Sequence, residues 1–331
     1  MPFLSRRDML RVAGLGAGLA LLPRALRAAT DSPAAGPACT PAQRTPNSAV
    51  YRFHIGAIEA AALVSGYLEG KPEQPFYAPQ ATAEEFRAAV ADAGIAEKLR
   101  LHFNILLLRV GGEVVLIDAG PGGKQPAHFA LVGLLAELGL KPANVSLVLL
   151  THAHFDHIGG LLDADGRIAF PNARHLCMSE EIDYWTAAKP DFSRLRMNPD
   201  GMVKAARRVF DVVPFERIGT ATRLPDGITP LLAAGHTPGH MALRIASRGQ
   251  TLHHIGDLTH HGALLVPHPD WTIASDCNEE QAAATRRAVF TQLAAEGTRV
   301  FGCHLPFPGL GRLITRGDGF RWQAEDWDAG V

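Results

Sequence analysis

The sequence predicts a four-layer α/β fold, an αββα sandwich in which two mixed β-sheets pack face to face and helices flank them. Short β-like runs alternate with helical runs along the chain, and the connections include both tight hairpins and helical crossovers. Strands connected in both ways form mixed sheets, and each sheet must cover an apolar face. With 331 residues, 47% of them hydrophobic, the chain can bury a substantial core.

Residues 1–29 are predicted to be a twin-arginine export signal. Arg6 and Arg7 precede an apolar run at residues 12–22. This run is too short to cross about 30 Å of hydrocarbon, but it suits the apolar core of a signal peptide. We therefore expect a periplasmic or secreted protein without stable membrane insertion. Residues 30–49, rich in Pro, Ala, Ser and Thr, are expected to form a flexible linker before one domain at 50–331.

Elements of the predicted domain follow from local patterns. The β-like runs are bounded by Gly, Pro and Asn, and Gly111-Gly112 indicates a hairpin between two of them. A capping box at Thr82–Glu85 predicts a helix to about Ala93, and Asn278 with Gln281 caps a second helix to about Glu296. The predicted strands are Tyr51–Val64, Phe103–Val110, Val114–Ile117, Val145–Leu150, Ile228–Ala233, Met241–Ala246, Thr251–Ile255 and Arg299–Phe301.

Charge and cysteine usage narrow the possible chemistry. The 32 Lys and Arg residues balance 33 Asp and Glu residues, so there is no basic excess for binding nucleic acid. The four Cys residues are scattered without a Cys-x-x-Cys pair, which argues against a thiolate metal site. Because the chain has 15 histidines, imidazole is the side-chain group that we first expect to take part in its chemistry.

Four potential metal ligands lie within six positions directly after the run Val145–Leu150: His152, His154, Asp156 and His157. Alternate residues of an extended segment share a face, so His152 and His154 are expected to point toward one ion. A sharp turn permitted by Gly159-Gly160 would direct Asp156 and His157 toward a neighbouring position.

Three further donors follow other strand-like runs: His236 in a Gly-His-Thr-Pro-Gly-His turn at 235–240, Asp257 and His304. Strand ends that meet at one edge of a sheet commonly form binding sites. Any one of these histidines alone would more simply be a buried core residue. Their joint spacing favours a metal site instead.

The His-x-His-x-Asp-His run, the turn at 235–240, Gly256-Asp257 and His304 resemble the metallo-β-lactamase superfamily. This resemblance implies the metallo-β-lactamase fold, which is an αββα sandwich. It also implies two divalent ions, one held by His152, His154 and His236 and the other by Asp156, His157 and His304, with Asp257 bridging them. Zinc is the expected metal, and iron, manganese or cobalt are also compatible with these donors.

The resemblance implies a hydrolase in which a metal-bridging hydroxide attacks a neutral ester-type bond of a small-molecule substrate. Asp156 and Asp257 would then also be catalytic, as carriers of a proton. Trp185 and Leu258 are predicted to line the substrate pocket, with core packing as the alternative. By the same resemblance, a homodimer is expected.

Two substrate classes remain open. Phe155 is also found in acyl-homoserine lactonases, which favours lactones, whereas the tail at 304–311 is similar to methyl parathion hydrolase, which favours phosphotriesters. The alternatives are a β-lactamase or general arylesterase of the same fold, or a metal-binding module without catalysis. Six other histidines are expected not to be ligands: His240, His253, His254, His260, His261 and His268. For the last three, surface exposure is favoured, with a loop near the mouth of the site as the alternative.

Overall fold

The computed structural model describes residues 48–122 and 131–326. The predicted export signal and most of the predicted linker lie outside these residues. Within the described ranges, none of the helices combines the length and the apolar character that crossing a bilayer requires.

The first half of the domain forms a seven-stranded sheet. Its strands are β1 Val50–Ile55, β2 Ile58–Gly70, β3 Leu99–Val110, β4 Glu113–Ile117, β5 Leu147–Leu150, β6 Arg174–Met178 and β7 Phe215–Ile218. They lie side by side in chain order. Pairing is antiparallel from β1 to β4 and parallel from β4 to β7, so the sheet is mixed.

The second half forms a six-stranded sheet. Its strands are β8 Ile228–Leu232, β9 Met241–Ser247, β10 Gln250–His254, β11 Arg299–Phe301, β12 Leu310–Arg316 and β13 Gly319–Ala324. The order in space runs from β13 to β8, and only β10 and β11 pair in parallel. The parallel pair requires a crossover, which contains the longest described helix, α6 Glu279–Glu296.

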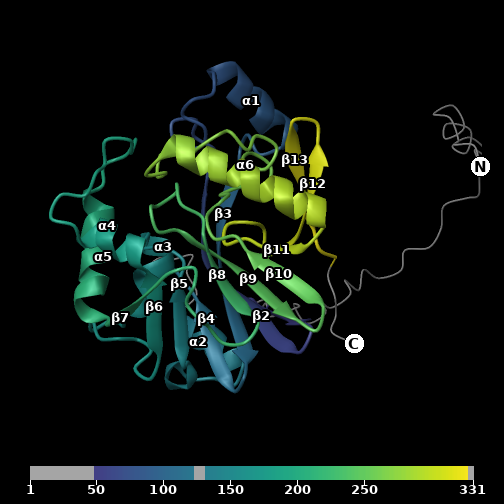
Figure 1. The fold of residues 1–331 in the computed structure, drawn as a ribbon. Helices are drawn as coiled ribbons and strands as arrows, with labels where there is room; N and C mark the ends of the chain where they lie inside the picture. The colour runs from purple at the N-terminus through teal and green to yellow at the C-terminus, as the bar shows by residue number, and fades with distance from the viewer. Residues whose placement is uncertain (1–47, 123–130, 327–331) are drawn as a thin grey trace, which may run out of the picture. The chain divides into compact units, whose positions relative to one another are not determined.

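The remaining helical segments are α1 Ala83–Asp92, α2 Leu131–Glu137, α3 Phe155–Ile158, α4 Ser179–Thr186 and α5 Asp200–Val212, with short 3₁₀ turns at Pro142–Asn144 and Gly159–Leu161. Apolar residues of α2, α4 and α5 pack with the outer face of the seven-stranded sheet. Those of α6 pack with the six-stranded sheet, across which this helix lies in Figure 1.

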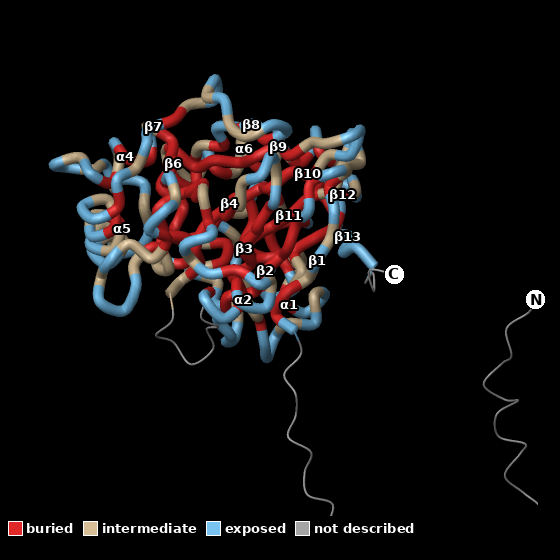
Figure 2. Tube along the Cα trace, turned by 90° about the horizontal axis from the view of Figure 1, so that it is seen from below, coloured by how far each residue is buried: buried red, intermediate tan, exposed pale blue. Residues whose placement is uncertain are grey.

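A separate apolar cluster lies between the two sheets. Leu106 and Val115 of the first sheet meet Leu243 and Leu252 of the second, and all four are buried. Figure 2 shows this burial as continuous red along the central strands, while the outer turns of the helices are exposed. Removal of this apolar surface from water favours the stacked arrangement. The predicted αββα sandwich of two mixed sheets is confirmed.

Local sequence signals explain where several elements begin and end. The Thr82 hydroxyl oxygen accepts the main-chain N–H of Glu85, and the Glu85 carboxylate accepts the main-chain N–H of Thr82. The capping box that opens α1 is therefore confirmed. Asn278 caps α6 in a similar way, and Gly297 ends that helix in the left-handed conformation. The hairpin at Gly111-Gly112 joins β3 to β4 through two positive φ values, as predicted.

The prediction of one strand over Tyr51–Val64 is wrong, because the chain turns back at Gly56 and forms the β1–β2 hairpin. Gly56 has φ +60°, and a Cβ there would lie 2.1 Å from the Ser247 carbonyl oxygen. Only glycine suits both the backbone conformation and this close approach. Apolar residues continue on both sides of the turn, so the run did not reveal the break.

Candidate metal centre

Four strand ends bring the seven predicted ligands to one edge of the domain. His152 and His154 follow β5, and the turn of α3 then presents Asp156 and His157. The other three ligands follow β8, β10 and β11, in the order His236, Asp257 and His304. All seven side chains are buried.

A first group of donors consists of His152, His154, His236 and Asp257. The Nδ1 atom of His154 lies 3.1 Å from Nε2 of His152 and 2.9 Å from Nε2 of His236. Oδ2 of Asp257 lies 3.5 Å from Nε2 of both His152 and His236. These four atoms therefore surround one common point.

A second group consists of Asp156, His157, Asp257 and His304. Nε2 of His157 is 3.2 Å from Oδ1 of Asp257, and Nε2 of His304 is 2.9 Å from its Oδ2. Oδ2 of Asp156 lies 3.7 Å from the His157 nitrogen and 3.5 Å from that of His304. Asp257 belongs to both groups, so its carboxylate joins two adjacent positions.

The two donor sets fit divalent metal ions. Tetrahedral coordination at zinc–nitrogen distances near 2.0 Å separates two ligand atoms by about 3.3 Å, close to the spacings found in both groups. Nε2 of His157 and Oδ1 of Asp257 are buried without a hydrogen-bond partner among the described residues. Buried polar atoms are normally paired, so these orphaned atoms indicate a missing positive ligand.

The histidines of the first group are held in the neutral form that binds metal. Burial lowers the pKa of His152, His154 and His236 well below the usual value, and neighbouring imidazoles add to this effect. In the second group, burial opposes the charged form of His157, but Asp257 and Asp118 outweigh it and raise its pKa. The two groups therefore differ in their electrostatic environment.

Contacts behind the ligands fix the orientation of the imidazole rings. Nδ1 of His157 lies 2.7 Å from Oδ2 of Asp118, and Nδ1 of His236 lies 2.7 Å from Oδ1 of Asp276. Nδ1 of His304 lies 2.7 Å from the main-chain oxygen of His102. Partners of this kind direct the other ring nitrogen toward a metal and raise its basicity.

Comparison with known proteins identifies the family. The model of the "Metallo-beta-lactamase superfamily" matches residues 101–317, which include all seven donors. The chain belongs to this superfamily. Its members share this sandwich but not one activity, so the function must be argued from the site.

Two curated proteins are similar to part of this metallo-β-lactamase-fold chain. A probable metallo-hydrolase of Mycobacterium bovis is 26% identical over 198 residues, and the match covers 50% of this chain and 60% of the relative. The N-acyl homoserine lactonase AttM of Azorhizobium caulinodans is 28% identical over 155 residues, covering 41% and 53%. The chain thus spans little more than half the length of these curated relatives.

A solved structure covers more of the chain. AidC, described as a dizinc quorum-quenching lactonase in complex with a product, superimposes with a TM-score of 0.78 at 29% identity. The match covers 85% of this chain and 99% of AidC. These similarities support a metal-dependent hydrolase with lactonase relatives.

Gly159 and Gly160 act differently from the prediction. We expected them to permit a sharp turn, but Gly159 has φ −59°, which any residue adopts. A Cβ on Gly159 would lie 2.2 Å from the Pro121 carbonyl oxygen, and one on Gly160 would lie 2.1 Å from that of Ala119. The two glycines therefore allow the loop after β4 to pack directly against the α3 segment.

The expectation of surface exposure for His260 and His261 is wrong, because both side chains are buried. Nε2 of His260 lies 3.1 Å from Oδ2 of Asp257, and its ring stacks on that of His304 with centroids 4.8 Å apart. His260 is three residues beyond Asp257, in the segment that leaves the end of β10. The alternative of a loop near the mouth of the site agrees better with the position of His260.

Sequence reasoning also missed Asp118, Glu181 and Asp276. Asp118 follows β4 directly and could have been found by the strand-end argument that located the ligands. Asp276 lies in an irregular segment before α6, and Glu181 lies in α4, where acidic residues are common at the first turn. Neither of these two carried a local signal.

Trp185 and Leu258, predicted to line the substrate pocket, are 0% and 2% exposed. Trp185 packs in the cluster beneath α4, with its ring centroid 5.7 Å from that of His154. Leu258 packs in the cluster beneath α6. Neither side chain offers an accessible wall in this structure, and their contact with substrate stays a prediction.

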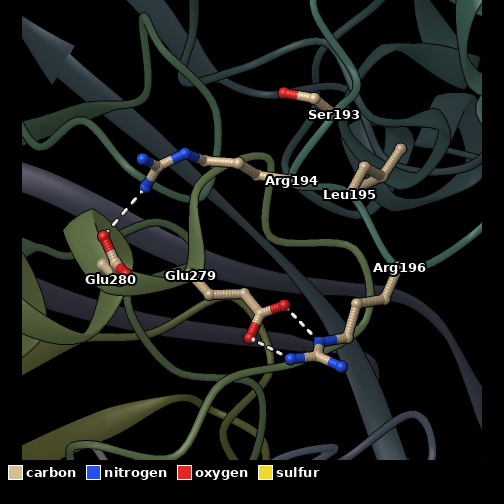
Figure 3. A pocket seen from close by; sticks show the side chains of 6 residues that line it. All are labelled: Ser193, Arg194, Leu195, Arg196, Glu279 and Glu280. Atoms are coloured by element: carbon tan, nitrogen blue, oxygen red, sulfur yellow. Dashed lines mark hydrogen bonds and ion pairs between the residues drawn. The ribbon is translucent and has the colours of Figure 1, made fainter.

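A surface pocket of about 460 Å³ lies at the start of α6, apart from the metal centre (Figure 3). The guanidinium of Arg194 lies 2.9 Å from a carboxylate oxygen of Glu280, and Arg196 pairs with Glu279 through two hydrogen bonds. These pairs occupy the charged groups of the pocket, and none of the seven donors lines it. Its size alone does not make it the reaction site.

Proposed function

We propose that this chain is an exported, dinuclear metal-dependent hydrolase that opens lactones. The observation that carries the proposal is the position of Asp257 between the two donor groups. Its Oδ1 lies 3.2 Å from Nε2 of His157. Its Oδ2 lies 2.9 Å from Nε2 of His304 and 3.5 Å from Nε2 of both His152 and His236. The similarity to AidC, whose description names it a dizinc lactonase, supports the lactone class.

In this proposal His152, His154, His236 and Asp257 hold one ion, and Asp156, His157, His304 and Asp257 hold the other. Zinc is favoured, because imidazole and carboxylate donors suit it. Two such ions would lower the pKa of a water molecule to near neutrality and polarise the carbonyl oxygen of the substrate.

The chain itself supplies the orientation and the proton transfer. Burial lowers the pKa of His260, so we infer that it is neutral and that its Nε2–H donates to Oδ2 of Asp257. This hydrogen bond would hold the bridging carboxylate in its orientation. Asp156 of the second group is a further carboxylate that could accept a proton during attack.

Phe155 is the proposed contact for the apolar part of the substrate. Its side chain is 46% exposed although its neighbours in the motif are buried, and its ring lies 6.1 Å from that of Phe103. An exposed aromatic ring beside a reactive centre offers apolar surface to an acyl chain. We expect Phe155→Ala to raise KM for long-chain lactones more than for short ones.

A phosphotriester is the second candidate substrate, because the segment 304–311 is similar to methyl parathion hydrolase. Both reactions direct hydroxide to a centre whose oxygen is polarised, so one site can serve both. The deciding experiment compares kcat/KM for an N-acyl homoserine lactone and a nitrophenyl phosphotriester. We expect a higher value for the lactone, loss of activity with a chelator and recovery with zinc. Failure on both substrates by the zinc-loaded protein would contradict the proposal.

Export is proposed from Arg6, Arg7 and the apolar run that follows them. Both arginines are expected to be needed for export, so replacing them with lysine should retain the precursor in the cytoplasm. Fractionation of cells that produce the two forms tests this. Equal amounts of both proteins in the periplasm and the medium would contradict it.

A further inference from the structure

The buried carboxylate of Glu181 lies between the two loops that carry the first donor group. We propose that Glu181 is a positioning residue: it fixes the His152–His154 segment against the His236 turn and thereby determines how tightly the first group binds metal. This inference rests on the proposed metal site. It concerns the geometry of the first group and not the reaction itself.

Each oxygen of Glu181 accepts two hydrogen bonds. Oε1 accepts the main-chain N–H of Ala153 at 2.8 Å and the indole N–H of Trp185 at 2.7 Å. Oε2 accepts the hydroxyl of Thr237 at 2.5 Å and the main-chain N–H of Gly239 at 3.0 Å. Glu181 is 0% exposed, so these four donors replace the hydration that the carboxylate loses.

The donors come from segments on both sides of the first group. Ala153 lies between His152 and His154, and Thr237 directly follows His236. The Nδ1 atom of His154 must approach Nε2 of His236 to 2.9 Å, although 82 residues separate them in sequence. A single carboxylate that binds both backbones fixes this distance through contacts that do not involve the imidazoles.

The packing around Glu181 leaves little freedom for the turn. A Cβ on Gly239 would lie 2.1 Å from the main-chain nitrogen of Glu181, so the turn lies directly against the backbone of α4. Trp185, one helical turn further on, holds Oε1 and places its ring against His154. The carboxylate is therefore held from its own helix while it holds the two loops.

An amide cannot replace this carboxylate, although its shape is nearly the same. If the NH₂ group stood in place of Oε1, it would face two N–H groups that can only donate, from Ala153 and Trp185. In place of Oε2 it would face the N–H of Gly239. Either orientation leaves buried donors unpaired, which is strongly unfavourable. We call the four hydrogen bonds accepted by Glu181 the Glu181 clamp. Glu181→Gln therefore perturbs this clamp with almost no change in side-chain volume.

The matched control is Glu180→Gln, because Glu180 is exposed in the same first turn of α4. Zinc affinity of the metal-free proteins is measured by competition with a chromophoric chelator, and Tm is measured with and without zinc. We expect Glu181→Gln to bind zinc about 10–100-fold more weakly, as for other residues that orient metal ligands. Its Tm increase on adding zinc should be smaller than that of the wild type. Glu180→Gln should match the wild type in both measurements.

A second pair of variants keeps the test decisive if Glu181→Gln does not fold. Thr237→Val removes the hydroxyl donor while conserving the shape, and Thr237→Ser retains the hydroxyl. We expect Thr237→Val to weaken zinc binding and Thr237→Ser to lie closer to the wild type. Cobalt-loaded proteins provide an independent readout, since a displaced ligand changes the visible absorption bands.

Two results would overturn the inference. One is a Glu181→Gln protein that loses Tm equally with and without zinc but keeps the wild-type zinc affinity, because Glu181 would then stabilise only the fold. The other is equal zinc affinity of Thr237→Val and Thr237→Ser. Failure of the wild type to bind zinc is a different result, since it contradicts the proposed function itself.

Discussion

The two donor groups that share Asp257 differ in charge and in how they are supported. The first group has three imidazoles, whose pKa values burial lowers, and only the shared carboxylate. The second group has two imidazoles and a further carboxylate, Asp156, which remains 9% exposed. The second group thus offers one more carboxylate to an ion than the first.

The supporting contacts also differ between the groups. In the second group, His157 contacts Asp118, which directly follows β4, and His304 contacts the main chain of β3. The first group depends on Asp276 before α6 and on Glu181 of α4. Both groups take donors from strand ends of the two sheets, so the geometry of each requires the two halves of the domain to be packed correctly.

Asp257→Asn is expected to have the largest effect, because it removes the one contact common to both groups. An amide supplies one oxygen instead of two and no negative charge. Activity should fall by more than about 100-fold, beyond the effect usual for residues that only orient a ligand. Zinc titration and lactone hydrolysis measure this. Retention of two tightly bound ions would show that the groups do not share this carboxylate.

Asp118→Asn should weaken the second group more than the first. Asp118 accepts the Thr151 N–H and hydroxyl, both at 2.8 Å, as well as His157 Nδ1. An amide group would oppose at least one of these donors. We expect about 10–100-fold lower activity. Asp92→Asn, on the exposed side of α1, is the matched control and should be unchanged.

Asp276→Asn should act on the first group, with an effect near the lower end of that range. It weakens the contact to His236 Nδ1 but leaves the Glu181 clamp in place. We expect about tenfold weaker binding of one ion, with the other ion unaffected. Titration with cobalt resolves the two binding steps. Equal weakening of both steps would contradict the distinction between the groups.

The smallest effect is expected at the first residue of β6, Arg174, which is not among the donors or their supporting residues. Arg174 and Glu216 form a bidentate ion pair there, at 2.6 and 2.8 Å, with both side chains largely exposed. Arg174→Ala should change the free energy of unfolding by less than about 1 kcal/mol, because water screens such pairs. Zinc affinity should not change. Denaturant unfolding and zinc titration check these two expectations.

The sequence predicted the layered fold and the seven donors because both depend on local signals. Apolar runs bounded by Gly, Pro and Asn mark the strands, caps such as Thr82 and Asn278 mark the helices, and the donors follow strand-like runs. The supporting residues are different. Glu181 and Asp276 act on segments 28 to 58 residues away in sequence, so only the packed structure shows what they contact.

The burial of His260 was also beyond the reach of sequence, whereas core packing was the stated alternative for Trp185 and Leu258. For His260 the outcome depends on which side of the irregular segment after β10 faces the interior, and that segment has no periodicity that reveals it. The fold of the β1–β2 hairpin was missed for a related reason, because Gly56 makes its contact with Ser247 of the other sheet. Local patterns predict elements well and long-range contacts poorly.

Metal occupancy of the native protein tests the central claim most directly. Elemental analysis of the dialysed protein should find two divalent ions per chain. Anomalous diffraction at the metal edge should place one ion within each donor group, with Asp257 between them. One ion per chain, or two ions bound elsewhere, would contradict this assignment.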